Sequence, residues 1–129
     1  MNEELKKQLL EIVDQIADLD KKMHEIARKK RKIWDRTSVI RAQLVIDIAK
    51  AKDEKDKPMY SNSKLREAAL TLRLKDDEGY QGLLERLREL DEEQEPLVIE
   101  HNRLVDQKTI LMMEMGFQSP PSSDNERII

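Results

Sequence analysis

The sequence predicts an all-α protein: a long antiparallel helical hairpin of the coiled-coil type that dimerises into a four-helix bundle. Three observations support this fold class. The chain is 40% charged and 3% aromatic, it has only three Gly and four Pro in 129 residues, and its apolar residues recur at helical spacing over two long segments. A high charge content would also suit a disordered chain, but disordered chains lack such periodic apolar residues.

The first segment, residues 3–52, is predicted to form one long helix. From Leu5 to Leu44, ten of the twelve positions at intervals of four and three are apolar, which is typical of a coiled-coil seam. The exceptions are Lys30 and Thr37. Asn2 can act as the N-cap, and two acidic residues follow in the first turn, where the helix dipole favours them. The apolar period stops around residues 50–53, so we expect the helix to end there.

The second segment, residues 63–115, repeats this pattern with two interruptions. Its main seam covers residues 80–115, and Gly116 can end the helix in a left-handed conformation. The stretch Asp76–Gly79 is expected to break the helix, because Asp can cap a new helix and Gly weakens its first turn. Pro96 is expected to kink the helix, because proline removes a backbone hydrogen bond and clashes with the preceding turn.

A shorter amphipathic piece precedes the interruption, with Leu65, Ala69 and Leu72 on one face. Extending the seam of the later helix backwards would place Arg66 and Arg73 on it. The two pieces are therefore predicted to be out of phase.

A polar connector, residues 53–62, joins the two segments and lets them fold back on each other. It contains a charged run, then Pro58, which disfavours helix at the residue before it, and Ser61–Ser63 supply three candidate N-caps. A connection of about 2–8 residues would suffice between packed helices. We therefore predict partner contacts at Tyr60, Ser61, Asn62 and Arg66. The alternative is that this segment is only a turn between two helices, with N-capping residues and no role in binding.

Residues 117–129 have no apolar period and include two adjacent prolines, which predicts a disordered tail. Residues 1–116 are predicted to form the helical hairpin as a single domain.

The segment DKPMYSNSKLREAALTLRLKDDEGYQGLLERLRELDEE, Asp56 to Glu93, resembles uncharacterised bacterial and phage coiled-coil proteins. These proteins have a K-P-x-Y-S-N turn, then a helix and an acidic-aromatic restart, and the resemblance implies a coiled coil without an established activity. Prefoldin-like chaperone subunits also have two long antiparallel helices and a similar length. They carry β-hairpins between the helices, whereas the connector here has no strand alternation, which argues against that family.

The two seams are wider than a two-stranded coil requires. Apolar residues recur at a flanking position beside each seam, among them Trp34 in the first segment and Val105 in the second. A third apolar position per heptad is typical of a bundle, so the hairpin is predicted to self-associate as a C2 homodimer. A different protein partner and a monomer are the alternatives. The residues assigned to the oligomer seam are Leu9, Ile12, Ile16, Leu19, Met23, Ile26, Ile33, Trp34, Leu83, Leu87, Leu90, Leu97, Leu104 and Leu111.

Three polar residues, Gln94, His101 and Lys108, occupy the same heptad position of the second seam in succession. Buried polar residues on a seam lower stability and fix the register or the oligomer state, which is the role we predict for them. The alternative is that this heptad position lies at the solvent-exposed edge of the bundle.

A basic run, RKKRK at Arg28–Lys32, lies close to Trp34 and is the best candidate for nucleic-acid contact, since cations pair with phosphates and an indole can stack on a base. A fold-back would place Glu85, Glu89 and the acidic residues 91–93 near this run, which favours a salt-bridged surface instead. The alternative function is therefore a DNA- or RNA-associated accessory protein of phage or mobile-element type. The residues assigned to that contact are Arg28, Lys29, Arg31, Lys32 and Arg36.

The sequence argues against several other classes of function. It has no Gly-rich phosphate loop and no Ser or Thr with a nearby base, so we expect no enzymatic activity, no catalytic residue and no cofactor. Neither His24 nor His101 follows a Glu three residues earlier, as di-iron bundles require, so we expect no metal site. No apolar run approaches the roughly 20 residues that span a bilayer. Absence of Cys suits a reducing cytoplasm.

These observations predict a cytoplasmic, non-enzymatic scaffold or protein interaction module. Its expected partners are a second copy of the chain and an unidentified protein, with no membrane partner.

Overall fold

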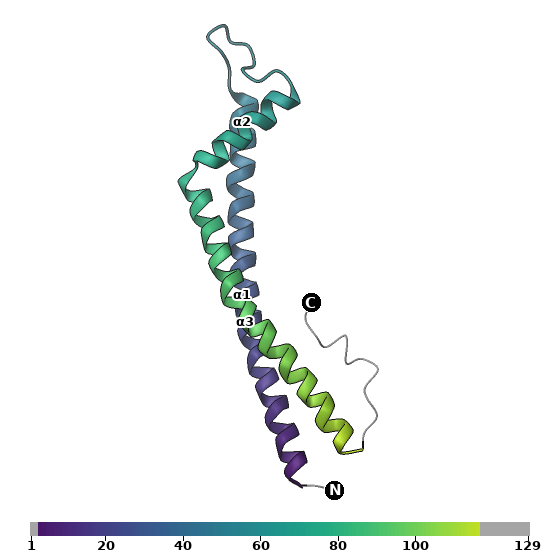
Figure 1. The fold of residues 1–129 in the computed structure, drawn as a ribbon. Helices are drawn as coiled ribbons and strands as arrows, with labels where there is room; N and C mark the ends of the chain where they lie inside the picture. The colour runs from purple at the N-terminus through teal and green to yellow at the C-terminus, as the bar shows by residue number, and fades with distance from the viewer. Residues whose placement is uncertain (1–2, 117–129) are drawn as a thin grey trace. The chain divides into compact units, whose positions relative to one another are not determined.

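The computed structural model describes residues 3–116, which form three helices and, within that range, no strand. In chain order these are α1 (Glu3–Lys50), α2 (Ser63–Asp76) and α3 (Glu78–Glu114) (Figure 1). The all-α prediction is confirmed. Within the described range, no helix combines the length and the apolar character that crossing a bilayer requires. The predicted N-cap Asn2 and the predicted disordered tail, residues 117–129, lie outside the described residues.

Local signals in the sequence account for the ends of the helices. The Asp77 carboxylate accepts a hydrogen bond from the Tyr80 backbone N–H at 2.7 Å, which caps the start of α3. The break between α2 and α3 therefore lies inside the predicted stretch. At the other end of α3, Gly116 has a φ of 90°, and its N–H donates to the Met113 carbonyl at 3.0 Å. Pro96 lies within α3, which continues on both sides of it, and the kink there stays a prediction.

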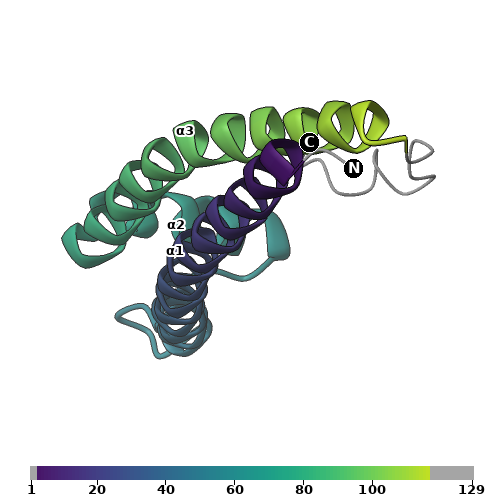
Figure 2. The same ribbon diagram turned by 90° about the horizontal axis from the view of Figure 1, so that it is seen from below.

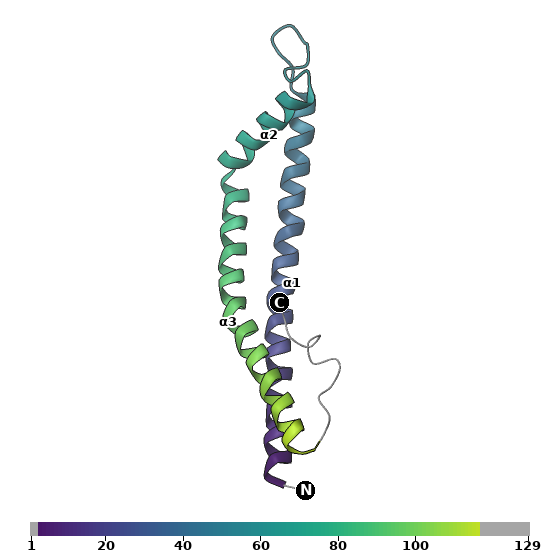
Figure 3. The same ribbon diagram turned by 45° about the vertical axis from the view of Figure 1, so that its right-hand side comes forward.

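The chain divides into two compact units. Unit 1 comprises Met1–Arg28 and Asp91–Ile129, and unit 2 comprises Lys29–Leu90. In unit 1 the first part of α1 lies beside the last part of α3 (Figures 1 and 2). In unit 2 the last part of α1 lies beside α2 and the first part of α3 (Figures 1 and 3).

Each unit has its own small core, made mainly of residues at the predicted seam spacing, with Val105 from the flanking position beside it. The residues from Leu5 to Leu44 that follow this spacing in α1 are all buried or half-buried, and so are those from Tyr80 to Leu111 in α3 and Met115 just after it. Leu90, in unit 2, is completely buried. The buried residues of unit 1 are Met23, Ile26, His101, Leu104, Val105 and Leu111. The buried residues of unit 2 are Thr37, Ile48, Ala69, Leu87 and Leu90.

The face of α2 that is buried differs from the predicted one. Ala69 is buried as expected, but Leu65 and Leu72 are exposed, Leu72 by 62%. Of the two arginines on the backward extension of the α3 seam, Arg73 is half-buried and Arg66 is exposed, so the predicted phase difference stays a prediction. Arg73 is tolerated at its half-buried position because its aliphatic stem can pack while its guanidinium lies 6.0 Å from the centre of the Tyr60 ring.

Candidate interaction surfaces

The connector is an ordered loop rather than an open bend. Its two sides are tied by backbone hydrogen bonds: the Met59 N–H donates to the Ala51 carbonyl at 3.0 Å, and the Asp53 N–H donates to the Lys57 carbonyl at 2.8 Å. An isolated antiparallel bridge lies between these two bonds. A single bridge is too short to count as a strand, so the connector still lacks the β-hairpin of the prefoldin-like subunits.

The Asp53 carboxylate holds the turn from inside. Its Oδ1 accepts hydrogen bonds from the backbone N–H groups of Lys55, at 2.9 Å, and Lys57, at 3.0 Å. The Asp53 carbonyl also accepts from the N–H of Asp56, whose φ of 62° lies in the left-handed region. Asp tolerates the left-handed conformation better than most residues, which suits Asp56. The short Asp side chain can also bond to backbone N–H groups a few residues on, which suits Asp53.

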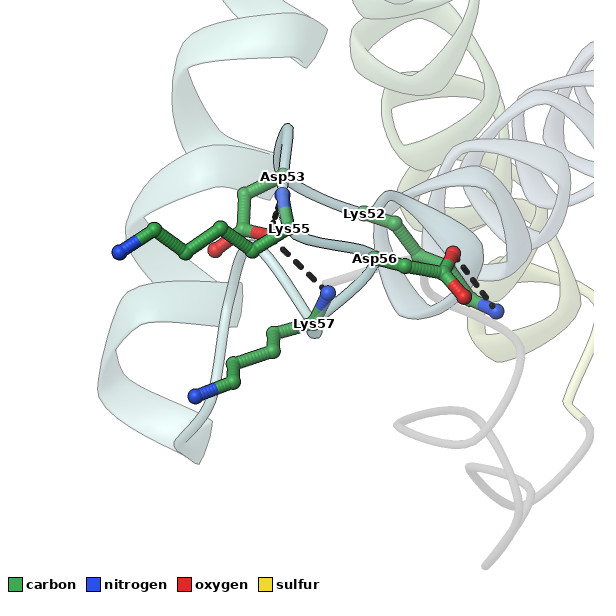
Figure 4. Close-up of polar contacts among 5 residues, drawn as sticks. All are labelled: Lys52, Asp53, Lys55, Asp56 and Lys57. Atoms are coloured by element: carbon green, nitrogen blue, oxygen red, sulfur yellow. Dashed lines mark hydrogen bonds and ion pairs between the residues drawn. The ribbon is translucent and has the colours of Figure 1, made fainter.

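These contacts change the charge that the loop presents. Asp53 is occupied by backbone N–H groups, and Asp56 forms an ion pair with Lys52 at 3.5 Å. Lys55 and Lys57 extend away from that pair (Figure 4). Lys55 and Lys57 are therefore exposed without an ion pair to any of residues 3–116, as is the carboxylate of Glu54. The composition of the connector does not show which of its charges are engaged, because the turn geometry decides it.

The four residues predicted to contact a partner lie together at the start of α2, and three of them hold local structure. Asn62 is the N-cap of α2. The Arg66 Nε donates to the Tyr60 carbonyl at 3.1 Å, and the Tyr60 ring lies against Arg73. Ser61 is exposed. Partner binding by these residues stays a prediction, and substituting Asn62 or Arg66 would also disturb the fold of the corner.

The predicted nucleic-acid contacts lie on α1 and are all exposed. Arg28 belongs to unit 1; the other four residues, Lys29, Arg31, Lys32 and Arg36, belong to unit 2. None of these five side chains forms an ion pair or a hydrogen bond with another residue of the described range 3–116.

The acidic residues of unit 2 that were expected to neutralise this run have partners on their own helix. Glu85 pairs with Arg88 at 2.5 Å, and Glu89 pairs with Arg86 at 3.0 Å. Both pairs are i,i+3 contacts on the surface of α3, so the carboxylates of Glu85 and Glu89 bind arginines of their own helix rather than cations of the basic run.

The polar seam residues are less exposed than the surface around them: His101 is 5% exposed, and Gln94 and Lys108 are half-buried. The His101 Nε2 lies 3.1 Å from the Asp20 carboxylate, whereas its Nδ1 is buried and has no hydrogen-bond partner in the described residues. His24 is exposed, so the two histidines do not share a site.

Next to His101 on α3, Glu100 and Arg103 form an ion pair across one helical turn. The hydrogen bonds that the Arg103 guanidinium donates hold the pKa of the Glu100 carboxyl below its usual value. Glu100 is therefore ionised down to a lower pH than an isolated Glu, as expected for a carboxyl group in an ion pair.

No group of three or more His, Asp or Glu side chains among residues 3–116 is arranged to hold a metal ion. Comparisons with protein-family models, curated proteins and solved structures find no match to this chain. The side chains and surfaces of the chain are thus the only basis for a functional proposal.

Many large apolar side chains stay exposed on both units. Val39, at 69%, is the most exposed of them within the described residues, and Trp34 is 55% exposed. Val39, Ala42 and Ile46 are all exposed and follow one another at intervals of three and four along α1. The sequence prediction considered only the flank that includes Trp34, although the same spacing could have revealed this second stripe. The others are Leu10, Val13, Val45, Met59, Leu65, Leu72, Ile99, Ile110 and Met113.

Unit 2 also contains two hollows. The larger is a groove of about 500 Å³ between α1 and the start of α3. The residues that line it are Asp35, Arg36, Val39, Ile40, Glu78, Gly79, Gly82 and Leu83. The smaller, of about 250 Å³, lies between the end of α1 and α2 and is almost entirely apolar. Its lining residues are Val45, Ile48, Ala49, Ser63, Arg66, Glu67 and Leu70.

Proposed function

We propose that this chain is a non-enzymatic, cytoplasmic coiled-coil scaffold that folds into an antiparallel hairpin and self-associates, most simply as a C2 dimer that forms a four-helix bundle. The connector at the end of α1 is the proposed site for a further protein partner, with Lys55 and Lys57 added to the residues that the sequence suggested. Long helices with narrow apolar seams bury little surface within one chain, which makes association the natural source of additional stability.

The observation that carries this proposal is the set of exposed apolar side chains in both units. Ile99 in unit 1 is 63% exposed and Val39 in unit 2 is 69% exposed. Burying a large apolar side chain contributes about 1.5–3 kcal/mol. Contiguous exposed apolar surface rimmed by polar residues is typical of an interface between proteins.

Sedimentation equilibrium at concentrations from one to tens of micromolar tests self-association. We expect a species of about twice the chain mass of 15.2 kDa that dissociates on dilution. Measuring helical content by circular dichroism on the same samples serves as the control for folding. A fully helical monomer at the highest concentration would contradict the proposal.

A second candidate function is nucleic-acid association through α1, supported by exposed cations in unit 2 that have no partner among residues 3–116. Binding to a labelled DNA duplex or RNA hairpin should be measurable at about 50 mM salt and fall steeply by about 200 mM, because released counterions drive it. Arg31→Glu with Lys32→Glu should abolish binding, whereas Lys6→Glu with Lys7→Glu, on a distant part of α1, should not. No binding at the lower salt would reject this candidate.

A further inference from the structure

We propose that the self-association surface is the groove of unit 2, where a second copy of the chain inserts Val39 between α1 and α3. This inference rests on the proposed scaffold function and assigns its interface to one face of the hairpin. It differs from the sequence prediction, which placed the interface on the flank that includes Trp34.

The groove has an apolar floor, and one of the residues that line it is a glycine, which has no side chain. Ile40 and Leu83 line it from the two helices, and Gly82 lies between them on the α3 side. A Cβ built at Gly82 would meet nothing within 4 Å, so the space above this residue is open. The opening of about 500 Å³ is large enough to receive an aliphatic side chain from outside.

The side chain that fits this opening stands on the rim of the same groove. Val39 lines the groove and is nevertheless 69% exposed. Since a two-fold axis places the same patch of both copies face to face, each Val39 can enter the groove of the other copy. Ala42 and Ile46 continue the apolar stripe along α1 and would extend the contact. An unrelated partner would have to supply both a protrusion and a cavity of matching shape.

The charges on the rim also match a second copy. Arg36 lies on α1 and Glu78 on α3, with Asp35 beside them, and none of the three forms an ion pair within the described residues. A rim with both signs has no preference for a polyanion or a polycation. In a two-fold pair, however, Arg36 of each copy can face Glu78 of the other, so two complementary contacts form at once.

Mixing two charge-reversed variants tests whether these contacts join separate copies. Arg36→Glu alone and Glu78→Arg alone each place like charges across the two-fold axis, and each should weaken dimerisation by about tenfold or more. An equimolar mixture of the two variants should restore dimerisation as a heterodimer, because both contacts then join opposite charges. A contact within one chain would not be rescued by mixing. Failure of the mixture to associate would overturn the proposal.

Two further measurements separate this interface from self-association in general. Gly82→Leu should fill the groove and weaken dimerisation at least tenfold while helical content is kept or raised, because Leu favours helix more than Gly does. Ser38→Leu, at an exposed position on another side of α1, is the matched control and should leave dimerisation unchanged.

Trp34 is the only Trp and lies about 140° around the helix from Val39, so its fluorescence emission should not change on dilution. Either of two results would reject this face and leave the scaffold proposal intact. One is that the Gly82→Leu variant dimerises as tightly as the wild type. The other is that the Trp34 emission of the wild-type dimer shifts on dilution. A wild-type monomer would reject both this face and the scaffold proposal.

Discussion

Replacing Leu90 with alanine is expected to lower the free energy of unfolding by about 2–5 kcal/mol. Leu90 is 0% exposed in a protein whose cores are narrow, so truncation removes apolar contacts and leaves a cavity that two helices cannot easily collapse around. Urea unfolding followed by circular dichroism at a fixed protein concentration measures the change, since association adds to the apparent stability.

Leu72→Ala is the matched control, because it is the same substitution on a helix of the same unit. Leu72 is 62% exposed, so we expect its loss to change the free energy of unfolding by no more than about 0.5 kcal/mol. Equal effects of the two substitutions would mean that the Leu90 side chain does not lie in a core, or that Leu72 is covered in solution by another copy or partner.

Replacing His101 with leucine is expected to act in the opposite direction and raise the free energy of unfolding by about 1–3 kcal/mol. The His101 Nδ1 is buried without a hydrogen-bond partner among the described residues, which is a cost that Leu does not carry. The Asp20 carboxylate loses its contact with Nε2 but is 58% exposed, so water can replace the lost bond. The same urea unfolding experiment measures this change.

The proposed role of the polar seam adds a second expected result for this variant. If His101 helps to fix the oligomer state, the leucine variant should be more stable and yet sediment as more than one species. His24→Leu is the control, because His24 is exposed on α1 and its replacement should change neither property. A loss of stability in His101→Leu would show instead that the bond to Asp20 outweighs the unpaired Nδ1.

The residue pattern predicts the helices well because their ends and inner faces depend on local signals. Asp77 caps α3 within the predicted break, and Gly116 adopts the expected left-handed conformation after α3. The buried face of α2 was not predictable in the same way. Leu65 and Leu72 share the apolar spacing of Ala69 and are nevertheless exposed. The contacts of Arg66 and Arg73 with Tyr60 follow from the fold of the corner, which apolar spacing cannot show.

The candidate surfaces were less predictable than the fold. The basic run was visible in the sequence, but the partners of the acidic residues expected to face it were not: Glu85 and Glu89 pair with arginines of their own helix. The groove at Gly82 could not be expected, because an empty space depends on how two helices diverge and no residue type encodes it. The outward direction of Lys55 and Lys57 likewise follows from the turn that Asp53 closes.

The closure of the connector also bears on how this chain could change over evolutionary time. The bond between Met59 and Ala51 ties off the loop at its base, while Asn62 sets the start of α2 independently. Sequence change inside the loop that this bond closes, residues 52–58, is therefore insulated from the helices, whose inner faces would stay the same. Such a loop can acquire a new recognition sequence without a new scaffold, so the same pair of helices could serve different partners.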